Sequence, residues 1–261
     1  MEQQIRFDDG AAYERMMGIW SRIVGEVFLD WLAPRSGLQW IDVGCGNGAF
    51  TELIVARCAP AEVQGIDPSE GQLAFARARS TAGLAEFRAG DAMALPFPDD
   101  TFDAAVMALV IFFVPDPVKG VAEMARVVKP GGLVAAYAWD IPSGGLPNEP
   151  IQVEMRAMGV QPLLPPNVNA GRLDALRELW TGAGLDAVQT RQITVQRTFE
   201  SFDEFWTTSL LGGGIGPVIA TMPPGDVKSL KTRVRARLRA DMTGRFTANA
   251  LANAVMGRMP M

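Results

Sequence analysis

The glycine-rich turn at residues 44–48 is the segment of the sequence best suited to binding chemistry. The apolar residues Trp40, Ile41 and Val43 lead into the turn, and a run with apolar residues on one helical face follows it. This order predicts a strand, a tight turn and a helix. Gly44, Gly46 and Gly48 allow the backbone to turn sharply and let a ligand approach it closely. Free amides at the start of the helix would face that ligand, and a turn without any ligand is the simpler alternative.

Two acidic segments follow the turn. Asp67 comes after a second apparent strand, residues 63–66, at the distance beyond the glycines where an acid binds a ribose diol. Its two carboxylate oxygens match two neighbouring hydroxyls, and a charge at a helix N-terminus is the structural alternative. The turn also fits the G-x-G-x-x-A dinucleotide pattern, so a nicotinamide-dependent oxidoreductase is one possible function. The other acidic segment, residues 90–103, begins with Gly90 and Asp91 and does not belong to the dinucleotide pattern.

Residues 42–46 (Asp-Val-Gly-Cys-Gly), Asp67 and segment 90–103 together resemble the class I S-adenosylmethionine-dependent methyltransferases. The resemblance covers residues 13–137 and is closest to the small-molecule enzymes of ubiquinone and menaquinone biosynthesis. It implies methyl transfer from S-adenosyl-L-methionine, with S-adenosyl-L-homocysteine as product, to a small acceptor. The cofactor-binding residues that it implies are Asp42, Gly44, Cys45, Gly46, Asp67, Pro68, Gln72, Asp91, Ala92, Met93 and Leu109.

The resemblance assigns a part of the cofactor to each of three acids. Asp42 would hold the methionine end, whose ammonium and sulfonium are positive, so that a nearby carboxylate is favourable. Asp67 would accept the ribose hydroxyls, and Asp91 would meet the adenine amine, with the Ala92 amide toward a ring nitrogen. An acid that satisfies turn amides is the structural alternative for Asp42, and a turn aspartate is the alternative for Asp91.

The sequence assigns no catalytic residue and no metal site. It contains no histidine, which excludes Ser-His-Asp and Cys-His catalysis and histidine-dependent metal sites. Many relatives have a polar residue after the fourth strand, whereas this chain has apolar residues 109–114. We therefore expect a largely apolar pocket for an acceptor that is already nucleophilic: a carbanion-like ring carbon, an amine or a thiolate. A non-catalytic module that binds the cofactor is the alternative.

Strands that alternate with helices predict an α/β fold with a doubly wound, mostly parallel seven-stranded sheet, an antiparallel last strand and helical lid insertions. We expect residues 1–35 to form a helical cover, 36–140 the cofactor-binding core, and 141–261 the rest of the sheet with lid segments 141–170 and 200–241. The expected strands are 38–43, 62–66, 85–88, 103–110, 133–138, 185–198 and 246–259. The expected helices are 7–32, 47–58, 69–80, 117–128, 151–158, 173–182 and a broken helical stretch at 202–239.

Aromatic side chains around these segments are the candidates for lining the acceptor pocket. Phe205 and Trp206 are adjacent on a predicted helix, so we expect at most one of them to point fully inward. Core or turn roles are the favoured alternatives for Tyr137 and Asp140. The complete set of candidates is Tyr13, Met17, Trp20, Phe112, Phe113, Tyr137, Asp140, Phe205 and Trp206.

Composition limits the partners of the chain. A net charge of −5 argues against broad nucleic-acid binding, and we expect the basic stretch at 228–239 to be a solvated amphipathic helix. The longest apolar run, residues 104–114, is too short to span a bilayer. The two cysteines lie outside any zinc-like spacing, and the N-terminus lacks the apolar core of a signal peptide. These features favour the cytoplasm and leave the oligomeric state undetermined.

Overall fold

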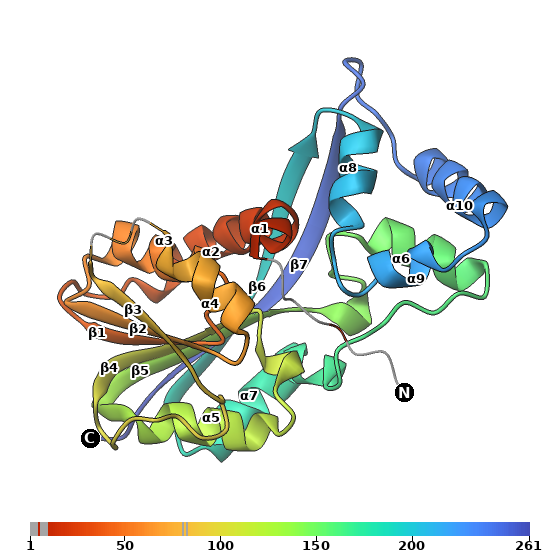
Figure 1. The fold of residues 1–261 in the computed structure, drawn as a ribbon. Coiled ribbons are helices and arrows are strands. Elements are labelled where there is room, and N and C mark those ends of the chain that lie inside the picture. Colours follow the sequence, from red (N-terminus) through yellow and green to blue (C-terminus); the bar gives the residue numbers. More distant parts are fainter. Residues whose placement is uncertain (1–4, 6–9, 80, 82) are drawn as a thin grey trace.

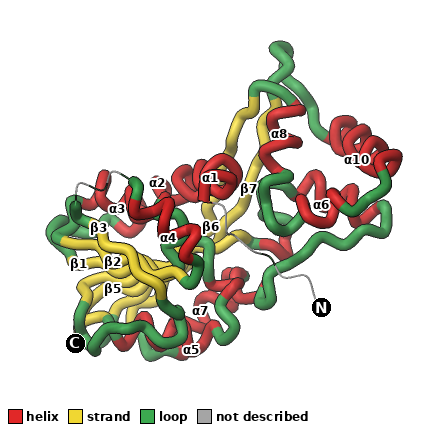
Figure 2. Tube along the Cα trace, viewed as in Figure 1, coloured by secondary structure: helices red, strands yellow, loops and turns green. Residues whose placement is uncertain are grey.

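Parallel pairing of five strands determines the architecture. The computed structural model describes residues 5, 10–79, 81 and 83–261. Its seven-stranded sheet has the order β3-β2-β1-β4-β5-β7-β6, in which β7 is antiparallel to both of its neighbours (Figures 1 and 2). The predicted fold class is confirmed. The strands are β1 (Gln39–Val43), β2 (Glu62–Asp67), β3 (Ala85–Ala89), β4 (Phe102–Ala108), β5 (Val128–Trp139), β6 (Asp186–Phe199) and β7 (Phe246–Arg258).

Helices cover both faces of this sheet, with α2 packed on α3 and α5 near α7 (Figure 1). Ser69 accepts a hydrogen bond from the Gln72 amide at the start of α4, and Asp116 caps α5 in front of Pro117. No described helix is long and apolar enough to cross a membrane. The helices of the core are α1 (Gly10–Tyr13), a π-helical turn (Glu14–Gly18), α2 (Ile19–Leu32), α3 (Ala49–Cys58), α4 (Glu70–Arg77), α5 (Pro117–Arg126) and α7 (Leu173–Gly182).

The predicted boundaries differ from the observed ones in a few places. The first helical segment is interrupted by the π-helical turn, and its predicted residues 7–9 lie outside the described residues. α4 ends at Arg77, whereas the prediction extends to residue 80, which also lies outside the described part. β5 begins at Val128, five residues earlier than predicted, because Val128 pairs with Phe102 before the register shifts.

A helical insertion separates β6 from β7, as predicted. It contains α8 (Phe202–Ser209), α9 (Gly216–Ala220) and α10 (Pro224–Arg237), which gather with α6 (Glu149–Ala157) beside the projecting β6–β7 hairpin (Figure 1). Phe205 and Trp206 are both buried, at 1% and 4% exposure, and only Phe205 lines a cavity, in agreement with the expectation that at most one of them points into the pocket. Phe205 packs on Phe199 of β6, whereas Trp206 stacks on Phe202 with Lys231 of α10 above its ring. Neighbours on two sides of α8 therefore bury adjacent residues.

An ion-pair cluster holds α10 against α6. Glu154 of α6, whose side chain is 8% exposed, accepts from Arg233 and Arg237 of α10, each at 2.7 Å. The two guanidinium groups lower the pKa of this carboxyl. Leu230 and Val234 are buried on the inner face of α10, in agreement with the predicted amphipathic helix. The cluster thus fastens the insertion to the segment that follows β5.

Replacing Glu154→Gln should loosen α10 without unfolding the sheet, because the two arginines lose their carboxylate partner. The two arginines are about half exposed, so solvent screening limits the contribution of these ion pairs to about 1 kcal/mol, and we expect local opening to increase about fivefold. Limited trypsin digestion, with cleavage sites identified by mass spectrometry, should show faster cleavage within 224–237. Asp226→Asn is the matched control, because the structure shows no ion pair for this α10 residue. Equal cleavage of wild type and Glu154→Gln would contradict this role.

Candidate functional site

The turn after β1 is held by hydrogen bonds to the end of β2. The amides of Gly44 and Cys45 both donate to the Ile66 carbonyl, at 2.7 and 3.0 Å. Gly44 has a φ of +76°, and a Cβ on it would lie 2.5 Å from Val110 Cγ2. A larger residue is therefore excluded by backbone conformation and by space. Gly46 instead faces open space, since its nearest neighbour would be 4.0 Å from a Cβ.

A buried carboxylate, Asp42, and a half-buried one, Asp67, flank this turn. Asp42 is fully buried at the end of β1, and Thr51 Oγ1 donates to its Oδ2 at 2.6 Å. Its Oδ1 has no hydrogen-bond partner among the described residues. Burial raises the pKa of Asp42 to about 7, with a smaller contribution from Asp67, while the Thr51 bond opposes the shift. A buried carboxylate oxygen without a hydrogen-bond partner lowers the stability of the fold unless the carboxyl is protonated or the oxygen contacts a cation.

Asp67 ties the glycine turn to the start of α4. Its Oδ2 accepts from the Gly46 amide and its Oδ1 from the Ser69 amide, both at 2.9 Å. Burial raises the pKa of this carboxyl, and the two amide bonds partly oppose the shift. Each carboxylate oxygen keeps a second lone pair that could accept a ligand hydroxyl.

The remaining cofactor candidates lie at the same edge of the sheet. Asp91, just after β3, is exposed and accepts from the Met93 amide at 2.8 Å, which stabilises a turn. Leu109, just after β4, has a φ of +62°, which is uncommon for a residue with a side chain. Its amide donates to the Tyr137 carbonyl at 2.7 Å, and its side chain lines the cavity described below. The ends of β1, β2, β3 and β4 thus bring the predicted residues together, as expected for parallel strands.

A charged network fixes the N-terminal segment over the glycine turn. Arg79, with an 8% exposed side chain, pairs with Glu14 of the π-helical turn and with Glu52 of α3. Asn47 Nδ2 donates to Glu14 Oε2 at 2.8 Å and to the Gly10 carbonyl at 3.3 Å. The sequence analysis did not identify Glu14 or Arg79, because their pairing joins residues 65 positions apart and leaves no local pattern.

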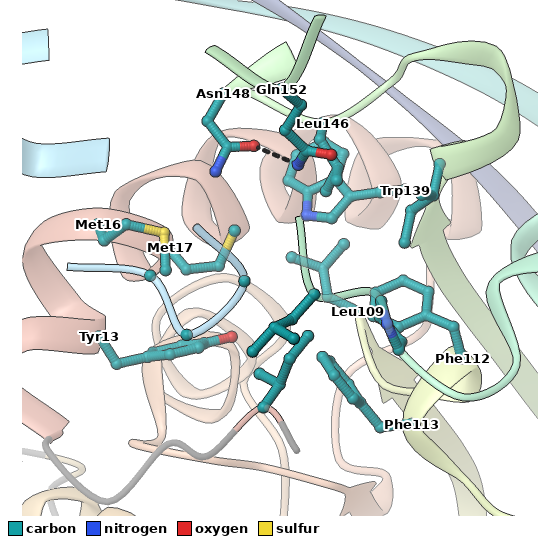
Figure 3. A pocket seen from close by; sticks show the side chains of 17 residues that line it. Tyr13, Met16, Met17, Leu109, Phe112, Phe113, Trp139, Leu146, Asn148 and Gln152 are labelled. Carbon is teal, nitrogen blue, oxygen red and sulfur yellow. Dashed lines mark hydrogen bonds between the residues drawn. The ribbon is translucent and has the colours of Figure 1, made fainter. Parts of the chain in front are cut away.

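An open cavity lies beside these groups, with about 590 Å³ of empty space when the solvent at its mouth is included (Figure 3). The candidates Tyr13, Met17, Phe112 and Phe113 line it, and no described lining residue is charged. Burial strongly raises the pKa of the Tyr13 hydroxyl, as do Asp67, Glu14 and Asp42, so this phenol stays protonated near neutral pH. Lining residues that the sequence analysis did not identify are Ile5, Met16, Trp139, Ile141, Leu146, Asn148, Gln152, Leu163, Pro165, Gly212, Gly213 and Gly214.

Five further candidates lie elsewhere. Trp20 and Phe205 line a smaller cavity that shares Met16, Met17 and Asn148 with the large one. Tyr137, Asp140 and Trp206 line neither cavity, and Tyr137 and Asp140 have the core and turn surroundings that are the favoured alternatives for them. Fully buried Tyr137 packs on Phe28 and Phe50, and its hydroxyl lies 3.0 Å from Ser21 Oγ. Asp140 accepts from the Ser143 amide, and Trp206 belongs to the α8 cluster.

The chain resembles known methyltransferases in sequence and in structure. Residues 41–136 match the family "Methyltransferase domain". The chain is 33% identical over 135 residues to the ubiquinone/menaquinone biosynthesis C-methyltransferase UbiE of Roseobacter denitrificans, covering 50% of this chain and 52% of the relative. It thus spans about half the length of the curated relatives that it matches.

Two solved structures show the same fold. The YcgJ protein of Bacillus subtilis has a TM-score of 0.62 at 18% identity, covering 91% of this chain and 98% of that one. Phosphoethanolamine N-methyltransferase 2 of Haemonchus contortus, in complex with S-adenosyl-L-methionine, has a TM-score of 0.56 at 18% identity. The match covers 91% of this chain and 52% of that one. Residues 41–136 therefore match a methyltransferase domain, within a chain that has the fold of these two structures and is similar in sequence to enzymes of ubiquinone and menaquinone biosynthesis.

Proposed function

We propose that this protein transfers a methyl group from S-adenosyl-L-methionine to a small, largely apolar acceptor. The observation that carries the proposal is a buried acid, Asp42, and a half-buried acid, Asp67, around an open glycine turn, with a cavity beside them whose described lining is uncharged. The match to a methyltransferase domain supports it and favours it over a nicotinamide-dependent oxidoreductase. The methyltransferase fold also hosts an S-adenosyl-L-methionine complex in the Haemonchus contortus enzyme.

The residues around the turn suit this cofactor. The orphaned Oδ1 of Asp42 favours a cationic ligand, and Gly46 leaves room against the backbone. Asp67 would accept the ribose hydroxyls, and Asp91 with Ala92 and Met93 would border the adenine. When bound, S-adenosyl-L-methionine would supply a methyl group on a sulfonium, whose departure leaves a neutral thioether. The other residues proposed to contact it are Gly44, Cys45, Pro68, Gln72 and Leu109.

The cavity would orient the acceptor and exclude water. Its described lining contains no carboxylate, lysine or arginine, and the pKa of Tyr13 is too high for this group to act as a base near neutral pH. We infer that the acceptor reaches the site already nucleophilic and that alignment and desolvation supply much of the rate. Segments 141–170 and 200–241 would cover this cavity, which Ile141, Leu146 and Gly212 border. The division into residues 1–35, 36–140 and 141–261 belongs to the same proposal.

Isothermal titration calorimetry with the full chain tests the proposed cofactor. We expect saturable binding of S-adenosyl-L-homocysteine and S-adenosyl-L-methionine, and no displacement of either by NADH. Failure of both to bind at millimolar concentration would refute the proposal. Turnover with any methyl acceptor would separate an enzyme from a non-catalytic module that only binds the cofactor.

Asp67→Asn should weaken S-adenosyl-L-homocysteine binding, because it removes the charge and half of the acceptor capacity facing the ribose. Losing a charge-assisted hydrogen bond costs about 1.5–3 kcal/mol, or roughly ten- to a hundredfold in affinity. Calorimetry measures the dissociation constant, and thermal melting reports whether the fold is intact. Asp100→Asn is the control, since Asp100 is exposed, lies before β4 at the opposite edge, and has a φ of +53° that asparagine tolerates. An unchanged affinity in a folded Asp67→Asn variant would show that Asp67 is only structural.

Cofactor affinity should depend on pH through Asp42. Its pKa of about 7 means that a cationic ligand must displace a proton below that pH, so the dissociation constant should rise by up to about tenfold per unit as pH falls from 7 to 5. Calorimetry at pH 5, 6, 7 and 8 measures this slope. Asp42→Asn should flatten it, and an equal slope in both proteins would assign the effect to another group.

The unliganded protein should show the linked effect on stability. Because the folded-state pKa of Asp42 exceeds the unfolded value of 3.8, folding takes up a proton between about pH 4 and pH 7. This contribution to the free energy of unfolding is complete below pH 4 and is lost as pH rises to 7. Between pH 5 and pH 8 the free energy of unfolding of the wild type should therefore fall by about 2 kcal/mol more than that of Asp42→Asn. Urea unfolding of both proteins at the two pH values measures this difference. No relative gain would contradict the buried, protonated carboxyl.

A further inference from the structure

Segment 10–18, which comprises α1 and the π-helical turn, is a wall shared by the two halves of the site. Tyr13 and Met17 line the uncharged cavity (Figure 3). Burial, and then nearby charges that include Asp67 and Asp42, raise the pKa of the Tyr13 hydroxyl, so the segment also lies near these acids. Asp42 is fully buried, so a ligand reaches its carboxylate only when part of the cover moves. Segment 10–18 belongs to no strand and could be displaced without breaking the sheet.

One buried arginine fastens this segment to the glycine turn. Arg79 follows α4, and its side chain is 8% exposed. It donates to the Glu14 carboxylate of the π-helical turn, to Glu52 of α3 at 2.7 Å, and to the Asn47 carbonyl at 2.5 Å. Asn47 completes a ring of contacts, because its Nδ2 donates to Glu14 Oε2 at 2.8 Å. Glu14 is therefore the residue through which the segment is held against the glycine turn.

The ion pair of Glu14 and Arg79 is better suited to fixing a position than to stabilising the whole fold. Both groups lose hydration on burial, which offsets much of their attraction. Without the Glu14 carboxylate, Arg79 keeps Glu52 and the Asn47 carbonyl as partners. Loss of the pair should thus leave the core network in place and release the segment.

Gly18 makes room for the Glu14 carboxylate. Its backbone is helical, with φ of −58° and ψ of −40°, so the conformation itself does not require glycine. A Cβ at this position would overlap Glu14 Oε2, and its three nearest heavy atoms all belong to Glu14. Alanine favours a helix over glycine, so what glycine provides here is space for the carboxylate.

We propose that the ion pair of Glu14 and Arg79 is a latch that holds segment 10–18 closed over the cofactor, so that its opening controls both entry and release of the cofactor. The two are positioning residues, since neither lines the cavity or belongs to the proposed cofactor contacts. Closing also places Tyr13 and Met17 in the cavity wall. The identity of the cofactor rests on the proposed function, whereas the latch rests on the contacts of the segment.

Two variants break the latch in different ways: Glu14→Gln removes the charge, and Gly18→Ala keeps the charge but displaces the carboxylate. Release of tritiated S-adenosyl-L-homocysteine from the full chain into excess unlabelled ligand gives the dissociation rate constant. Calorimetry gives the dissociation constant, and the two values together give the association rate constant. Hydrogen–deuterium exchange without ligand measures the opening of segment 10–18 directly.

We expect both variants to raise both rate constants and the exchange of segment 10–18 roughly tenfold, the value of one charge-assisted hydrogen bond. The dissociation constant should change less than about threefold, because opening precedes both entry and release. If Gly18 were only a helix residue, alanine would slow the opening instead. The direction of the Gly18→Ala effect therefore separates a latch from a general effect on stability.

Asp30→Asn and Gly182→Ala are the matched controls and should leave the rates and the exchange unchanged. Asp30 of α2 pairs with Arg57 of α3 at 2.7 Å, and both side chains are exposed. Gly182 ends α7, and a Cβ on it would meet open space. Thermal melting identifies the folded variants, and each latch variant keeps the test decisive should the other fail to fold.

Rate constants and exchange unchanged within twofold in the folded latch variants would overturn the proposal. A rise in the dissociation rate alone, with an equal loss of affinity, would also overturn it, because Glu14 would then act on the bound ligand and not on entry. Absence of S-adenosyl-L-homocysteine binding to the wild type would refute the proposed function and the control of cofactor exchange. Faster exchange of segment 10–18 in both variants would still identify the ion pair as its fastening, and unchanged exchange would reject that too.

Discussion

The parallel pairing of β1 with β2 and β4 is the constraint on which the rest of the site depends. It brings the carboxyl ends of these strands to one edge, where the chain must turn away from the sheet. Gly44 makes the first turn at a φ of +76°, and the bond from the Gly46 amide to Asp67 joins it to the end of β2. A change in strand register would separate these groups, so the same contacts that stabilise the core also position the site.

Charge divides this edge into two halves. Asp42 and Asp67 lie over β1 and β2, where they suit a cationic ligand with hydroxyl groups, while an uncharged cavity lies over the ends of β4 and β5. Tyr13 borders both halves, since it lines the cavity and both acids contribute to its raised pKa. In a water-poor site a positive sulfonium would be stabilised from the acidic half while an apolar acceptor packs in the other half. The network of Glu14, Arg79 and Asn47 keeps the N-terminal segment over this junction.

Local patterns in the sequence predict most of the sheet and the ends of its strands, because apolar periodicity, the glycine turn and the caps at Ser69 and Asp116 act over a few residues. The cavity depends on contacts between distant segments and is predicted less well. Trp139 looks like an ordinary strand residue, and the orientation of the Asn148 amide depends on Gln152 and Arg156 of α6. The same limit applies to Trp206, which Lys231 of α10 covers, and to Tyr137, around which Phe28 and Phe50 pack.

A crystal structure of the full chain with S-adenosyl-L-homocysteine tests the central claim most directly, because the claim concerns where each part of one ligand lies. The account predicts ribose hydroxyls on Asp67, adenine beside Asp91, the amino acid end near Asp42, and the sulfur next to Leu109 facing the uncharged cavity. A ligand bound away from the glycine turn would contradict it. So would a sulfur that points away from the cavity, because no acceptor held there could then reach the methyl group.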